Sequence, residues 1–128
     1  MTEIASGSKY TAFFDGACYP KNPNGKMGWG AVVLEDGVIL KEYAGFAQEK
    51  KGNTNNVAEY LGFMDVLNII KELGLKEVHI MGDSKLVVDQ INGKMRVSSG
   101  MYYEAAKQAQ KEYKQMSYDG YKFTVSWV

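Results

Sequence analysis

The sequence has 128 residues, of which 45% are hydrophobic and 23% are charged, values typical of a globular domain that needs no disulfide to fold. The formal net charge is +0, which argues against nucleic-acid binding through overall charge. A local basic patch remains possible, because a carboxylate metal site would hide it in the total.

Cysteine usage and hydropathy indicate the cellular compartment in which the protein is expected. Cys18 is the only cysteine, so no internal disulfide can form and a reducing compartment is expected. No apolar run approaches the ~20 residues of a membrane span, and residues 1–9 lack the apolar segment of a signal peptide. We expect a single domain over 1–128, with residues 1–8 flexible, in a cytoplasmic, monomeric protein that binds no membrane.

The expected elements follow the order strand, strand, strand, helix, strand, helix, helix, strand. Asp36-Gly37 predicts a tight hairpin turn between the second and third strands. The main helix carries apolar residues at helical spacing, and Gly74 ends it. The strands are expected at 9–14, 27–34, 38–46, 76–82 and 121–128, and the helices at 56–73, 84–92 and 101–116.

This order indicates an α/β fold with a five-stranded mixed sheet. The first three strands form an antiparallel meander. Each helical crossover joins parallel strands, so the fourth and fifth strands are expected to run parallel to the first. We expect helices on both faces of the sheet.

Three carboxylates lie where the expected elements meet: Asp15, Glu59 and Asp83. Each has a simpler interpretation when taken alone. Asp15-Gly16 is common turn chemistry, Glu59 has capping-box spacing from Asn56, and Asp83 can cap the helix that follows it. However, if the first and fourth strands are parallel neighbours, their ends lie ~4.8 Å apart. Asp15 and Asp83 are then side by side, and Glu59 can reach the same point.

Three like charges at one point repel strongly unless a cation neutralises them. Two Mg²⁺ ions ~3.5–4 Å apart fit such a cluster and serve an in-line attack on a phosphodiester. Carboxylate ligands without a nearby thiol or imidazole favour Mg²⁺ or Mn²⁺ over zinc. The sequence therefore predicts a two-metal site formed by Asp15, Glu59 and Asp83.

Several segments, in this order and at this spacing, resemble type 1 ribonuclease H over residues 9–128. They are Phe13-Phe14-Asp15-Gly16-Ala17-Cys18, Asn22-Pro23-Asn24-Gly25, Gly28-Trp29-Gly30-Ala31, Thr54-Asn55-Asn56-Val57-Ala58-Glu59 and Gly82-Asp83-Ser84. The resemblance implies a ribonuclease H-like fold and two-metal hydrolysis of the RNA strand of RNA–DNA hybrids. The products would carry 5′-phosphate and 3′-hydroxyl ends.

The resemblance also implies roles for individual residues. Asp15, Glu59 and Asp83 match the catalytic metal ligands, and the Gly16 carbonyl lies near one ion. Short amides suit the A-like minor groove, whose 2′-hydroxyls can be read without sequence preference. The positions that match nucleic-acid contacts are Cys18, Asn22, Thr54, Asn55, Asn56, Ser84 and Lys85.

The sequence departs from the family pattern in three places. Family members continue past Ser126-Trp127-Val128 into a helix with a fourth acidic ligand; the given sequence stops at Val128, so either that segment was removed or the molecule lacks it. Many also have a histidine in a mobile loop, whereas the single histidine here, His79, falls in the expected fourth strand and is interpreted as structural. The basic protrusion of some members is missing too, so hybrid affinity is expected to depend on Lys85, Lys94 and Arg96.

Two alternative functions follow from these departures. Without the fourth carboxylate, the chain could be a non-catalytic or weakly active module that binds hybrids or double-stranded RNA. It could also be a nuclease of the wider superfamily that acts on other nucleic acids. The tyrosines of the last helix and strand could stack on bases, although packing is the commoner use of such residues.

Overall fold

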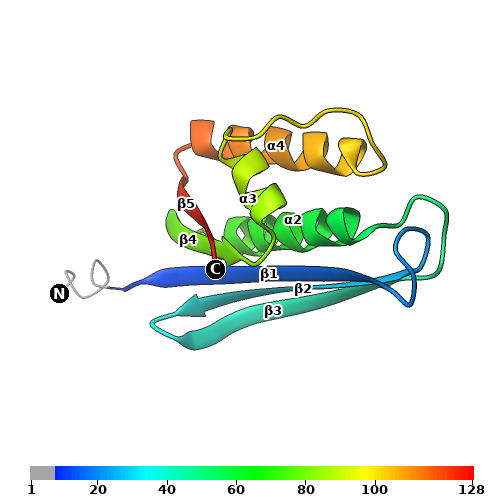
Figure 1. Cartoon of the computed structure of the whole chain (residues 1–128). Helices are drawn as coiled ribbons and strands as arrows, with labels where there is room; N and C mark the ends of the chain where they lie inside the picture. The colour runs from blue at the N-terminus through cyan, green and yellow to red at the C-terminus, as the bar shows by residue number, and fades with distance from the viewer. Residues whose placement is uncertain (1–7) are drawn as a thin grey trace.

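The computed structural model describes residues 8–128 as one five-stranded sheet with three helices (Figure 1). The prediction of a flexible start falls largely on residues 1–7, which lie outside the described residues. The strands are β1 (Tyr10–Tyr19), β2 (Lys26–Glu35), β3 (Val38–Ala47), β4 (Glu77–Gly82) and β5 (Lys122–Trp127). The helices are α2 (Asn55–Leu73), α3 (Lys85–Ile91) and α4 (Tyr103–Tyr118).

The predicted order of elements and the predicted mixed sheet are both confirmed. The strand order across the sheet is β3-β2-β1-β4-β5. β1 pairs antiparallel with β2, and β2 with β3, around the turn at Asp36 and Gly37. β4 lies parallel to β1 on its other side, and β5 lies parallel to β4.

The predicted end of the first strand at residues 15–17 is wrong. β1 continues to Tyr19 and holds Asp15 in extended backbone opposite Gly30 of β2. On its other side, the pairing with β4 stops at Phe14 opposite Gly82. The antiparallel neighbour supplies the hydrogen bonds that continue β1, so Asp15 lies within a strand but at the point where β4 has just ended.

The predicted placement of helices on both faces is also wrong for the described residues. Their three helices all cover one face, with α2 over β1 and α4 beyond it (Figure 1). Buried side chains that alternate along the strands, such as Ala12, Phe14, Val78 and Ile80, form the core with these helices. The two crossovers, from β3 to β4 and from β4 to β5, proceed in the same direction across the sheet. Right-handed crossovers of that kind place both sets of helices on the same face.

Helix α2 is the centre of the core. Its N-cap is Thr54, whose hydroxyl accepts a hydrogen bond from the Val57 amide, and its C-cap is Gly74 in the left-handed region at φ 69°. Tyr60 and Phe63 are fully buried, as are other apolar side chains along the helix. No helix among residues 8–128 has the length and apolar character needed to cross a bilayer.

β1 and α2 meet at Gly16, where the two backbones lie closer together than any residue with a Cβ atom would allow. A Cβ atom on Gly16 would lie 2.3 Å from the Ala58 carbonyl carbon and 2.5 Å from the Glu59 nitrogen. These are backbone atoms of a buried helix, so they cannot move aside cheaply. The absence of a side chain at Gly16 therefore fixes how closely Glu59 can approach β1.

We expect Gly16→Ala to lower the free energy of unfolding by roughly 3 kcal/mol or more, because overpacking forces the backbone of α2 away from the sheet. Gly28→Ala is the matched control, since its Cβ would meet only the Tyr19 hydroxyl at 3.5 Å. Urea unfolding of both variants makes the comparison. Equal stability of the two variants would contradict the contact described here.

Candidate active site

The structure brings three carboxylates from three elements to one point. Asp15 lies in β1, Glu59 in the second turn of α2, and Asp83 in the bend between β4 and α3. One oxygen from each carboxylate lies within 4.8 Å of one oxygen from each of the others. Asp15 and Asp83 are exposed to solvent, whereas Glu59 is 8% exposed and closes the cluster from the core side.

The capping interpretations of Glu59 and Asp83 do not hold in the structure. Glu59 does not complete a capping box with Asn56, because Thr54 is the N-cap of α2. Asp83 does not cap α3, because the Ser84 hydroxyl accepts the hydrogen bond from the Val87 amide. The carboxylates of Glu59 and Asp83 are therefore not used to terminate helices.

The ionised form of the Glu59 side chain is electrostatically unfavourable in the absence of a cation. Its pKa is raised from 4.5 to about 8, first by burial, then by the nearby charges of Asp83 and Asp15. A hydrogen bond from the Gly16 backbone opposes this shift only in part. Glu59 Oε1 is a buried atom without a hydrogen-bond partner among the described residues. Buried polar atoms usually have partners, so this oxygen is free to accept a bond from a ligand.

The cluster fits a hard divalent cation. All its donors are carboxylate oxygens, and the orphaned oxygen of Glu59 belongs to the group that most needs a positive charge. Cys18 is buried, and its thiol donates to the Lys21 carbonyl (3.2 Å). His79 contacts the Ser126 hydroxyl at 2.8 Å and takes no part in the cluster.

The N-terminus of α2 lies against the loop that follows β1, and amide side chains join the two. The Asn22 side-chain oxygen accepts from the Asn55 backbone N–H (3.2 Å), and the Asn55 side-chain oxygen accepts from the Cys18 N–H (2.6 Å). Asn22 and Asn55 are exposed, and Asn56 is half-buried. Among the predicted contact residues, Asn22, Asn55 and Asn56 thus lie together at the N-terminus of α2, whereas the Cys18 side chain is buried.

Asn53 holds this surface together and was not singled out from the sequence. It is 6% exposed, and its side-chain nitrogen donates to the carbonyls of Gly25 (2.9 Å) and Gln48 (2.8 Å). The Asn24 side-chain oxygen accepts a further hydrogen bond from the Gly52 N–H (2.9 Å). Nothing in an asparagine-rich segment distinguishes the buried residue from its exposed neighbours, so the sequence carried no usable signal.

Two predicted basic residues, Lys85 and Lys94, line a pocket of about 310 Å³ between α3 and the end of β5. Lys85 pairs with Asp89 (2.6 Å) one turn further along α3. Trp127 is a further residue that the sequence analysis did not identify as functional. Its indole N–H donates to the Asp83 carbonyl (3.2 Å), so the end of β5 holds the backbone of a candidate metal ligand.

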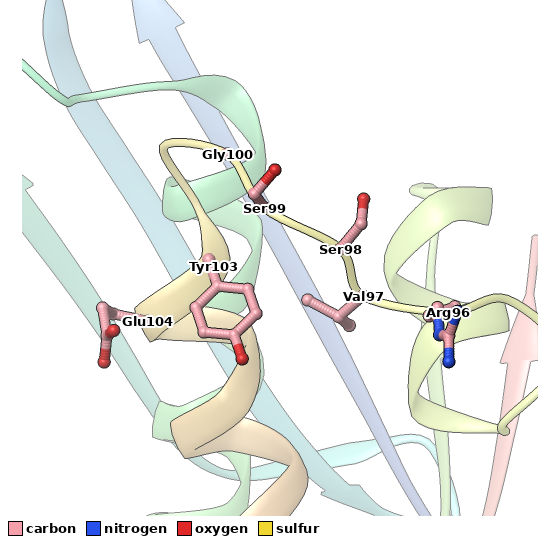
Figure 2. A pocket seen from close by; sticks show the side chains of 7 residues that line it. All are labelled: Arg96, Val97, Ser98, Ser99, Gly100, Tyr103 and Glu104. Carbon is pink, nitrogen blue, oxygen red and sulfur yellow. The ribbon is translucent and has the colours of Figure 1, made fainter.

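Arg96 lies apart from this pocket. It belongs to the connection between α3 and α4, where an open pocket of about 610 Å³ separates the connection from Tyr103 and Glu104 (Figure 2). The Tyr103 ring lies at the wall of this pocket and is 37% exposed. Tyr113 stacks instead on Phe123, with ring centroids 5.5 Å apart, and is part of the packing of α4 against β5.

Comparison with known proteins supports one family. A sequence model described as reverse transcriptase-like matches residues 13–122. The bifunctional protein Rv2228c of Mycobacterium tuberculosis is 35% identical over 104 residues, which cover 77% of this chain and 27% of that protein. Ribonuclease HI of Halobacterium salinarum is 32% identical over 87 residues, covering 68% of this chain and 42% of that protein. The chain thus spans less than half the length of these curated relatives.

A solved structure extends this likeness to three dimensions. The N-terminal RNase H domain of Rv2228c, determined as a fusion with maltose binding protein, superposes with a TM-score of 0.79 at 29% identity. The match covers 95% of this chain and 83% of that one. The chain belongs to the ribonuclease H family and has the ribonuclease H-like fold.

The raised pKa of Glu59 predicts a dependence of stability on pH in metal-free protein. The unfolded chain releases this proton near pH 4.5 and the folded chain near pH 8. Between these values the folded state binds more protons, so the stability of the wild type falls as pH rises. The Glu59→Gln variant has no carboxyl group at this position and should not show this dependence. In EDTA at pH 8, its free energy of unfolding should exceed that of the wild type by on the order of 2–4 kcal/mol.

At pH 3.5 the Glu59→Gln variant and the wild type should be about equally stable, because the carboxyl group, with a pKa of 4.5 in the unfolded chain and about 8 in the folded chain, is then largely protonated in both states of the wild type. Urea unfolding across this pH range measures the difference. Parallel pH profiles for the two proteins would contradict the shifted pKa.

Proposed function

We propose that this protein is a divalent-metal-dependent endoribonuclease that hydrolyses the RNA strand of RNA–DNA hybrids. The observation that carries the proposal is the cluster of Asp15, Glu59 and Asp83 around a buried carboxylate oxygen without a partner. Membership of the ribonuclease H family supports it, as does the name ribonuclease HI of the Halobacterium relative.

In this proposal Asp15, Glu59 and Asp83 would hold Mg²⁺, with Mn²⁺ as a substitute, and the Gly16 carbonyl would offer a further oxygen ligand. When bound, two such ions would supply a Lewis acid for the attacking water and for the charge on the scissile phosphate. The fold's contribution is to hold the three carboxylates together before metal or substrate arrives. Cleavage leaves 5′-phosphate and 3′-hydroxyl ends.

The surface formed by the N-terminus of α2 is proposed to bind the hybrid. Thr54 lies beside a phosphate of the DNA strand, and the amides of Asn22, Asn55 and Asn56 read the minor groove without sequence preference. Their side-chain nitrogens donate no hydrogen bond within the described part of the chain, so they can serve a 2′-hydroxyl. Further contacts are proposed for Cys18, Ser84, Lys85, Lys94 and Arg96.

The proposed enzyme works as a monomer in the cytoplasm. All three carboxylates come from one chain, so the cluster needs no second subunit. The single cysteine is buried, which suits a reducing compartment.

A cleavage assay tests the proposed activity. With labelled hybrid and Mg²⁺ or Mn²⁺, the wild type should release RNA fragments with 5′-phosphate ends. Asp83→Asn should slow this by roughly 10²–10³-fold or more, because a charge that holds the metal is lost. Asp119→Asn, at the C-cap of α4, is the matched control and should retain activity.

Equal cleavage by the wild type and the Asp83→Asn variant would end the proposed mechanism. Hybrid binding by the wild type without cleavage, even in Mn²⁺, would favour a binding module instead. Preferential cleavage of double-stranded DNA would indicate a nuclease with another substrate.

Two neighbouring asparagines separate hybrid binding from stability. Asn56→Ala should raise the KM for hybrid about 5–10-fold, the cost of about one hydrogen bond, with little change in melting temperature. Asn55→Ala should raise the KM similarly and also destabilise the fold by about 1 kcal/mol, since it leaves the Cys18 N–H without its acceptor. Steady-state kinetics and thermal unfolding measure the two effects, and an unchanged KM in both variants would contradict the proposed surface.

A further inference from the structure

A buried glutamine joins α2 and α3 to the connection between α3 and α4. Gln90 lies in α3 and is 1% exposed. Its side-chain oxygen accepts a hydrogen bond from the Tyr60 hydroxyl of α2. Its side-chain nitrogen donates to the Arg96 carbonyl (3.3 Å) and to the Tyr102 hydroxyl (3.1 Å). The amide thus bonds to three groups from different parts of the chain.

The connection has few other attachments to the core. Lys94, Arg96 and the residues from 98 to 101 are exposed, whereas Val97 is 6% exposed and packs into the core. Beyond Val97 the connection borders the open pocket in front of Tyr103 (Figure 2). The backbone N–H groups of Lys94 and Met95 bond to the Asp89 carbonyl (2.8 and 3.2 Å) and fix the start of the connection. Beyond them, its path depends on Val97 and on the hydrogen bond from Gln90 to the Arg96 carbonyl.

Packing alone does not explain an amide at this position. A methionine or leucine side chain has similar volume and could be buried among apolar residues without the cost of removing polar atoms from water. A buried amide is compatible with stability only when its partners are in place, and it then fixes their relative orientation. Here those partners are one helix of the core and the chain on either side of Val97.

We propose that Gln90 is a positioning residue for nucleic-acid binding: it fixes the connection relative to α2 so that Arg96 meets a phosphate of the bound hybrid. The inference rests on the proposed function. Tyr60 directly follows Glu59 in α2, so the chain of bonds from Tyr60 through Gln90 to Arg96 begins beside a candidate metal ligand. The Tyr60 and Tyr102 rings stack with their centroids 6.3 Å apart, so they hold the end of the connection where α4 begins.

A double-mutant cycle tests the proposal. Gln90→Met should raise the KM for hybrid about 5–10-fold while kcat stays within about twofold, because the metal ligands are untouched. Arg96→Ala should raise the KM by a similar factor. In the double variant the two effects should not multiply, because Gln90 acts through Arg96. Gln110→Met is the matched control, since the Gln110 amide bonds to the Gln90 backbone (3.1 Å) and not to the connection.

Multiplying effects on KM would overturn the proposal, and so would an unchanged KM in either single variant. If Gln90→Met does not fold, Tyr102→Phe replaces it: this change removes one hydroxyl partner and should raise the KM about 2–3-fold. Hybrid affinity is also measured by fluorescence anisotropy in the Asp83→Asn background. An inactive wild type would end the proposed function, whereas the anisotropy cycle would still decide whether Gln90 positions Arg96.

Discussion

The close approach of α2 to β1 is the constraint on which the site depends. It requires glycine at Gly16 on β1 and is helped by Gly62 on α2, where a Cβ would lie a tight 3.0 Å from the carbonyl oxygens of Asp15 and Gly30. With the helix seated this deeply, Glu59 lies beside Asp15 and faces Asp83 across the end of β4. The packing of the core therefore determines the positions of the charges.

This arrangement places three like charges together and buries one of them, which destabilises the metal-free protein at neutral pH. The surrounding structure tolerates the cost because α2 is capped at both ends and buried along its length. A bound cation would convert the repulsion into attraction. The same cluster that weakens the apo protein is thus what makes the site suited to metal, a common relation between stability and function.

Much of the fold could be predicted from the sequence because its signals are local. Asp36-Gly37 and Gly74 mark a hairpin and a helix end through their own backbone preferences, and the apolar spacing of α2 is a helical signal. The length of β1 and the placement of the helices on one face could not be predicted in this way. They depend on β2, which continues to pair beyond Asp15, and on the direction of successive crossovers. The expected parallel pairing of the first and fourth strands predicted the carboxylates' shared site, and the family resemblance agreed with it. Asn53, Trp127 and Gln90 act instead through contacts with distant residues that no local pattern reveals.

An NMR titration of the Glu59 carboxyl carbon, with and without Mg²⁺, measures the interaction between these carboxylates most directly. Without metal, the pKa of Glu59 should be near 8. Saturating Mg²⁺ should lower this pKa by several units, since the cation favours the charged carboxylate. An ordinary pKa near 4.5 in the metal-free protein, unchanged by Mg²⁺, would contradict the claim that the fold forces these carboxylates together for a metal.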